Sequence, residues 1–221
     1  MTLQITSGGG AGWAGIPGFD PETNDVRFAL TTLGDLMGTA EDLVRACARL
    51  VAEEGVAALS LRKVAQRVGI KAPSVYAHFE GKEALLLAAQ GEACAGLREA
   101  LLSHAKGPTP RKRLVAMGLG YLAFAEAHPE LFDLMFFATR SASAEPAGET
   151  PESSPYGVLR AEVARFLGDE GPKADELSFG IWSLVHGAAV LRRTHLKGLP
   201  LPLKAWAQSN LSALLDQWEA R

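Results

Sequence analysis

Helical periodicity after residue 38 is the feature that most constrains how this chain can fold. The first apolar stripe is formed by Leu43, Cys47 and Leu50, and stripes with the same three- and four-residue spacing continue almost to the C-terminus. A strand would need apolar and polar residues in alternation, and the sequence after residue 38 has no credible run of that kind. We therefore predict an all-α fold of about nine helices.

Local start and stop signals divide this helical region. Thr39 and Asp42 make a start that resembles a capping box, and Gly55 supplies the stop. Ser60 is a good N-cap for a second helix, which Gly69 ends. The other helices are expected from about Ala72 and over 82–104, 109–127, 130–139, 156–168, 173–196 and 203–219, with a Pro-, Glu-, Ser- and Gly-containing loop between 141 and 155.

Residues 1–38 differ from the rest of the chain in composition. They are rich in Gly and carry four acidic residues against one base without a sustained period, which predicts a flexible tail. Met37 directly precedes the first predicted helix and is therefore an alternative translation start. The segment 10–15 matches G-x-G-x-x-G, but Pro17 and Pro21 follow where a dinucleotide site needs a helix, so we assign it no function.

The segment 61–82, LRKVAQRVGIKAPSVYAHFEGK, gathers positive charge in an acidic chain. It has five Lys and Arg against one acid, whereas the whole chain has a net charge of −3, so any surface for nucleic acid must be local. Two short helices joined by a Gly-containing turn form a helix-turn-helix, whose second helix enters the major groove. On a helical wheel, Val75 and Phe79 face the core. The opposite face suits a groove, with small residues at its centre and longer polar ones at its edges: Pro73, Ser74 and Ala77, then Lys71, Tyr76 and His78.

The alternative interpretation of this segment is a charged, solvated surface without a partner. However, residues 39–90 resemble the N-terminal DNA-binding domain of the TetR/AcrR family of transcriptional regulators, through the stretch LRKVAQRVGIKAPSVYAHFEGKEALL. The pair Pro73-Ser74 departs from the small helix formers common in the family, so no base preference is carried over. The candidate DNA-binding residues, all but Ser60 at positions that match the family's DNA-facing sites, are Ser60, Arg62, Lys71, Ser74, Tyr76, His78 and Lys82.

This resemblance implies a homodimer that binds double-stranded operator DNA and responds to a small-molecule effector. It also implies a division into a tail (1–38), a helix-turn-helix DNA-binding domain (39–90) and a ligand-binding and dimerisation domain (91–221). The stretches WSLVHGAAVL and HPELFDLMF resemble one C-terminal subclass of the family that has a W-x-x-x-H-G signature. The resulting expectation is a repressor that an effector releases from a pseudo-palindromic operator.

The predicted helix 173–196 is apolar on two faces, and such a helix must be covered on both. Gly180, Ser183 and Gly187 add a strip of small residues that lets a partner backbone approach closely. We therefore predict that helices 173–196 and 203–219 form a four-helix bundle with a second copy of the chain. The apolar stripes are Leu177, Ile181, Leu184, Ala188 and Leu191, then Phe179, Trp182, His186 and Ala189, then Ala207, Leu211, Leu214 and Trp218.

Aromatic, Met and His residues recur on the helices that precede this region and on one face of helix 173–196. Such a cluster is typical of a cavity for a mostly apolar ligand, and the alternative is ordinary core. The two His would be the polar contacts of a neutral, largely hydrophobic effector. The candidate ligand-binding residues are Tyr121, Phe124, His128, Phe132, Met135, Trp182 and His186.

Several classes of protein do not fit the sequence. No apolar run reaches the roughly 18 to 20 residues that span a bilayer, and the N-terminus lacks the pattern of a signal peptide, so we expect a cytoplasmic protein. No catalytic motif, cofactor site or metal-ligand spacing occurs, which disfavours an all-α enzyme. One further alternative is a redox-sensing regulator that uses Cys47 or Cys94, although both fall on or beside apolar helix faces.

Overall fold

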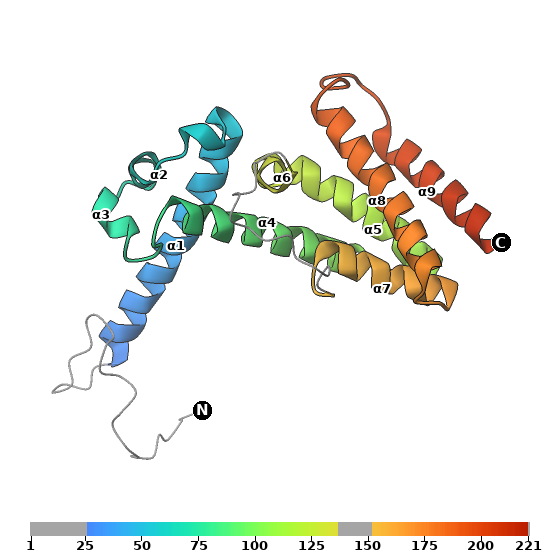
Figure 1. Ribbon diagram of the computed structural model, residues 1–221, viewed down its shortest axis with the longest axis horizontal. Helices are drawn as coiled ribbons and strands as arrows, with labels where there is room; N and C mark the ends of the chain where they lie inside the picture. The colour runs from blue at the N-terminus through green and yellow to red at the C-terminus, as the bar shows by residue number, and fades with distance from the viewer. Residues whose placement is uncertain (1–25, 137–151, 221) are drawn as a thin grey trace, which may run out of the picture.

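The computed structural model describes residues 26–136 and 152–220, with side chains from residue 39 onward. These residues form nine α-helices and one short 3-10 helix without any strand, which confirms the all-α prediction (Figure 1). The helices are α1 (Val26–Glu54), α2 (Leu61–Val68), α3 (Ala72–Val75), α4 (Lys82–His104), α5 (Pro110–Ala127), α6 (Pro129–Phe136), α7 (Pro155–Leu167), α8 (Pro172–Arg193) and α9 (Leu203–Glu219), and the 3-10 helix η1 is Val56–Ala58.

The helices pack around two separate hydrophobic cores. One core is built mainly by α1, α2, α3 and the first half of α4, and the other by α5, α7, α8, α9 and the second half of α4. Figure 1 shows α4 running from the first group of helices to the second. The short helix α6 also joins the two, because Leu134 is buried in the first core and Phe132 in the second. A displacement of α6 would therefore change the packing of both cores.

Capping follows the sequence closely in the first core. The Ser60 side chain accepts a hydrogen bond from the Lys63 backbone N–H at 3.3 Å and so begins α2. Gly69 ends α2 with φ of +82°, a left-handed conformation that favours glycine. The predicted boundaries of α2 are confirmed, and the same local signals place the start of α3 near Ala72.

The first helix is longer than predicted. Helix α1 begins at Val26 and not at Thr39, so the predicted start of the first helix is wrong, and residues 1–25 lie outside the described part. Val26, Leu30 and Leu33 recur at helical spacing, and glycines within a helix cost only about 1 kcal/mol each relative to Ala. The apolar period therefore outweighs the two glycines in this segment.

Which faces of α8 and α9 are buried and which are exposed also differs from the prediction. Leu177 and Ile181, on one apolar stripe of the helices predicted to form the dimer bundle, are buried in the chain's own core, and Ala207 and Leu211 of α9 are buried with them. Phe179 is instead 69% exposed. A helical wheel gives the angles between stripes but does not say which one faces α5 and α7. The outward faces of α8 and α9 remain available for a second copy of the chain.

Candidate DNA-binding surface and ligand site

The helix-turn-helix is held in place by three buried side chains. Val64 and Ala65 of α2 and Val75 of α3 are fully buried against α1 and α4, and the helical wheel predicts the burial of Val75. Phe79 and Ala72 pack at the edge of the same core. This anchoring turns the remaining faces of α2 and α3 outward, which is the arrangement that a groove-binding helix needs.

The candidate DNA-binding residues lie on or beside this outward face. Arg62, Lys71, Ser74 and Tyr76 are exposed, and the Tyr76 side chain is 63% exposed although it is large and aromatic. The other three candidate residues are partly buried at helix ends. Ser60 caps α2, His78 follows α3 and Lys82 begins α4. The structure therefore brings all seven to one region of the first domain.

The charge of this surface is smaller than the sequence suggests. Two bases of α2 are neutralised by the end of α1, because Lys63 lies 2.7 Å from Glu54 and Arg67 lies 2.6 Å from Glu53. The hydrogen bond from Lys63 lowers the pKa of Glu54, so this carboxylate stays charged. When Glu53 and Glu54 are counted together with Glu80, the acid within segment 61–82, the five bases of the segment are balanced by three acids. The cations left without a carboxylate partner among the described residues are Arg62, Lys71 and Lys82.

Glu53 and Glu54 are thus residues next to the candidate site that sequence reasoning missed. They precede the basic segment 61–82 and belong to a different helix, so counting charges within the segment leaves them out. A signal was present, because two adjacent acids end α1 just before a turn that folds α2 back against it. Their effect is to reserve the positive charge for the outward face, at three defined positions.

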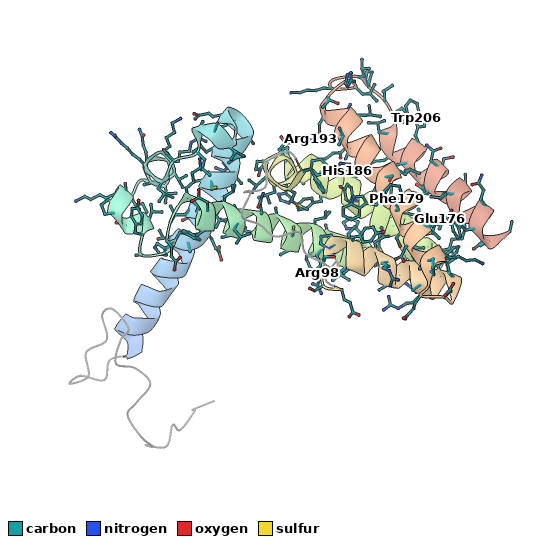
Figure 2. The ribbon with its side chains drawn as sticks, in the orientation of Figure 1. Arg98, Glu176, Phe179, His186, Arg193 and Trp206 are labelled. Atoms are coloured by element: carbon teal, nitrogen blue, oxygen red, sulfur yellow. The ribbon has the colours of Figure 1, made fainter. Side chains whose placement is uncertain are left out.

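In the second core, an aromatic cluster surrounds His186 of α8. The Tyr121 hydroxyl is hydrogen-bonded to His186 Nδ1 at 2.8 Å, and the Phe132 ring stacks on His186 with centroids 5.7 Å apart. Trp182 meets Tyr121 edge-on at 5.2 Å. Four of the predicted ligand-binding residues, from α5, α6 and α8, are therefore linked in one cluster, in which Tyr121 contacts the other three. Figure 2 shows His186 on the side of α8 that faces α6.

Two aromatic residues outside the predicted set complete this aromatic cluster. The Phe136 ring lies 4.5 Å from His186, and the Tyr156 ring lies 5.8 Å from Trp182. Phe136 lies one helical turn after Phe132, so the spacing on α6 places the two rings on the same face. Tyr156 comes from α7, which is far away in sequence. Tyr121 and Phe132 are fully buried, whereas the other four are partly buried and form the open side of the cluster.

The remaining predicted ligand residues lie apart from this cluster. His128 is exposed where α5 ends, and its ring contacts Phe124 at 5.2 Å, so it does not form a second polar contact next to His186. Phe124 is buried near Gly96 of α4, and Met135 packs at the edge of the second core. His128 departs from the expected position because α5 ends at Ala127, which leaves His128 beyond the last buried turn.

Burial sets the protonation of the polar pair in the cluster. Desolvation raises the pKa of Tyr121 far above its ordinary value and lowers the pKa of His186 below 6.5. Both groups are therefore neutral at pH 7. A neutral, hydrogen-bonded pair among aromatic rings suits a ligand of low polarity.

The depressed pKa of His186 predicts a pH dependence of folding. The unfolded chain takes up a proton on this ring near pH 6.5, and the folded chain does so only at lower pH. The contribution of His186 to the free energy of unfolding should be complete above pH 6.5 and should decline as the pH falls below it. Urea unfolding of the chain and of His186→Gln at pH 5.5 and 7.5 measures this, and the difference between the two proteins should shrink at the lower pH. An equal difference at both pH values would contradict the prediction.

Within residues 39–136 and 152–220, no group of three or more His, Cys, Asp or Glu gathers in a way that could hold a metal ion. None of the helices in the described part is long and apolar enough to cross a membrane.

Comparison with known families decides the assignment of this architecture. Residues 43–89 match the model of the bacterial regulatory proteins of the tetR family, and residues 114–214 match the tetracyclin repressor-like C-terminal domain. The chain belongs to the TetR family. Members of this family are ligand-responsive DNA-binding transcriptional regulators rather than enzymes, and this TetR-family chain is such a regulator.

Sequence relatives support the assignment to the TetR family over most of the chain. The chain is 25% identical over 162 residues to the class D tetracycline repressor protein of Escherichia coli, which covers 72% of this chain and 68% of the relative. The class C repressor, also from Escherichia coli, is 27% identical over 145 residues, covering 65% and 60%.

Solved structures share the fold. The TetR family transcriptional regulator PfmR from Thermus thermophilus superposes with a TM-score of 0.59 at 19% identity, covering 79% of this chain and 97% of that one. A TetR variant from Acinetobacter baumannii in complex with minocycline gives 0.54 at 22% identity, covering 80% and 94%.

Proposed function

We propose that this TetR-family regulator is a repressor that binds a pseudo-palindromic operator as a homodimer in the cytoplasm. The observation that carries this proposal is the outward face of α2 and α3, where Arg62, Lys71 and Lys82 are free of carboxylate partners within the described chain while Lys63 and Arg67 are neutralised. Unpaired cations around a face of small residues suit phosphates on either side of a groove. Ser74 and Tyr76 are exposed on and directly after α3, and are available to the base edges and the sugar-phosphate backbone.

The second copy of the chain is proposed to pack on the outward faces of α8 and α9. Phe179 on α8 and Trp206 on α9 are exposed apolar side chains (Figure 2). A Cβ atom at Gly187 of α8 meets nothing within 4 Å, so the surface of α8 is low at this position. Exposed large apolar residues beside small ones are typical of a helical interface. Two copies joined in this way would present two helix-turn-helix units to successive turns of the same face of DNA.

The effector is proposed to be a small, neutral and largely hydrophobic molecule that enters the open side of the aromatic cluster. Trp182, His186 and Phe136 are only partly buried, so a ligand can contact them without unfolding the core. Phe136 and Phe132 belong to α6, and α6 also inserts Leu134 into the core of the DNA-binding domain. A ligand that moves α6 would therefore change the position of that domain and the spacing of the two DNA-binding units.

The direct test of the repressor proposal is selection of bound sequences from a random DNA pool with the full chain. We expect an enriched pseudo-palindrome with two half-sites about one or more helical turns apart. Enrichment of a single asymmetric site, or of none, would overturn the homodimer model. The selected DNA then serves as the probe for compounds that release the regulator.

Lys82→Ala should flatten the salt dependence of operator binding. Each phosphate contact contributes about −0.9 to the slope of log affinity against log salt, so the loss of one contact in each of two protomers changes the slope by roughly 1.8. Titrations of operator DNA at several salt concentrations measure it. Lys106→Ala is the control, because Lys106 is an exposed lysine in the turn between α4 and α5. An unchanged slope for Lys82→Ala would show that Lys82 does not contact DNA.

Trp182→Ala should weaken the response to effector more than it weakens operator binding. Trp182 lies at the open side of the cluster, where its ring contacts Tyr121 and Tyr156. Compounds that release the unmodified regulator are compared with both proteins in a mobility-shift titration. Equal losses of release and of ligand-free DNA binding would mean that Trp182 is a core residue and that the effector binds elsewhere.

The raised pKa values of both cysteine thiols disfavour the alternative function, a redox-sensing regulator. Cys47 is fully buried, and burial raises its pKa to about 12. Cys94 is exposed on α4, but desolvation of its thiol raises its pKa as well. The thiolate is the reactive form, so neither residue is primed for oxidation at neutral pH. Operator binding that is the same with and without reductant is the expected result.

A further inference from the structure

A pocket of about 320 Å³ lies outside the aromatic cluster, where the second half of α5, the start of α6, the last turns of α8 and the start of α9 meet. Its volume falls at the lower end of the range typical of small-molecule sites. Its floor is apolar and buried, formed by Leu122 and Ala125 of α5 and Ala189 of α8. The two alanines leave the space that larger side chains would fill.

The rim of this α5–α8–α9 pocket is strongly basic. Arg192, Arg193, Lys197 and Lys204 line it, against Glu126 as the acidic residue of the lining. Lys204 is paired with Glu126 at 3.0 Å. Arg193 is held by Asp133 of α6, with its Nε donating to Oδ1 at 3.0 Å, and its guanidinium lies 5.7 Å from the centre of the Phe132 ring.

Two of these cations are left over once the ion pairs are counted. Arg192 Nη1 donates to the Leu199 backbone carbonyl at 2.7 Å, which fixes the guanidinium beside the loop between α8 and α9 without neutralising it. Lys197, in that loop, has no carboxylate partner in the described ranges. A buried apolar floor below a rim with two uncompensated positive charges is a site with two different chemical halves.

We propose that this pocket binds a small organic carboxylate with an apolar body, placing the body on the alanine floor and the carboxylate between Arg192 and Lys197. Hydrogen bonds from charged donors to a carboxylate are about twice as strong as neutral ones, and a guanidinium can form two in parallel. The ligand differs in class from the neutral effector proposed for the aromatic cluster. Figure 2 shows Arg193, on the wall of this pocket, beyond His186 toward the end of α8.

Octanoate is a suitable probe, and isothermal titration calorimetry of the full chain tests the proposal. We expect one octanoate per chain, weaker binding as salt is raised, and at least about tenfold weaker binding of 1-octanol, which has the same body without the charge. The double variant R192Q/K197Q keeps polar side chains but removes both charges, and should weaken octanoate binding about tenfold. Absence of binding, or equal affinity for octanoate and octanol, would overturn the proposal.

A matched control separates the pocket from the general charge of the chain. K106Q/K173Q removes two exposed positive charges elsewhere, and should leave octanoate affinity unchanged. Ala188→Phe fills the pocket from α8 without changing any charge and should abolish binding, which keeps the test decisive if the Gln variant folds poorly. If none of the pocket variants changes the affinity for octanoate, octanoate binds at another site on the chain. Trp182→Ala should bind octanoate normally, so this result is independent of the effector proposed for the aromatic cluster.

Discussion

Gly187→Leu should yield a folded monomer that binds the full operator at least about a hundredfold more weakly than the unmodified regulator. A Cβ atom built at Gly187 meets nothing within 4 Å, so the protomer itself has room for the larger side chain. The leucine would instead project from α8 toward the proposed partner, where close packing of small residues is needed. Joining two DNA-binding units raises affinity by about 10² to 10⁴, and a monomer loses this gain.

The matched control is Gly91→Leu on α4. Gly91 is exposed, and a Cβ atom there also meets nothing within 4 Å, but it lies on a different helix from the proposed interface. Sedimentation should give a dimer for Gly91→Leu and a monomer for Gly187→Leu, with equal melting temperatures of the protomer fold. Binding to an isolated half-site should be the same for both. A dimeric Gly187→Leu protein would place the interface on another surface.

A third glycine shows why the position matters more than the residue type. A Cβ atom at Gly118 of α5 would lie 2.5 Å from Leu211 Cδ1 and 3.2 Å from Val185 Cγ1, which belong to α9 and α8. Gly118→Leu should therefore disturb the protomer core, at a cost of about 1 to 3 kcal/mol or more. The sequence alone does not separate Gly118 from Gly187, because both are glycines in apolar helical stretches.

Features set by neighbouring residues could be predicted from the sequence. Helix α2 begins at a Ser60 cap and ends at Gly69, and α4 to α9 lie close to their predicted ranges where the structure describes them. These boundaries depend on residues within a few positions of each other. The inward anchor Val75 followed from helical spacing in the same way.

Features set by contacts between helices could not be predicted in this way. The neutralisation of Arg67 depends on how α1 and α2 cross, and the addition of Tyr156 to the aromatic cluster depends on where α7 packs. The burial of Leu177 and the exposure of Phe179 depend on which face of α8 meets α5 and α7. Periodicity gives the directions of these side chains relative to one another, but the partner helices decide which of them lie inside.

Phe132→Ala should have the largest effect on stability, lowering the free energy of unfolding by about 3 to 5 kcal/mol. Phe132 is fully buried on α6 and lies at the centre of the aromatic cluster. Its ring stacks on His186, meets Tyr121 edge-on at 6.1 Å and contacts Phe136 at 4.9 Å. Truncation removes these contacts and leaves a cavity. For a chain of this size, each kcal/mol shifts the melting temperature by about 2 to 4 °C, so we expect a decrease of roughly 6 to 20 °C.

Phe179→Ala makes the same chemical change at an exposed position on α8, and should lower the protomer's stability by less than about 1 kcal/mol. Thermal unfolding of both variants at several protein concentrations separates the protomer from the dimer, because only the dimer contribution depends on concentration. The Phe132 variant should also lose operator binding near its lowered melting temperature, since α6 carries Leu134 in the core of the DNA-binding domain. Equal melting temperatures for the two variants would mean that the Phe132 ring does not hold α6 in the second core, and the proposed route from effector to DNA would then lose its support.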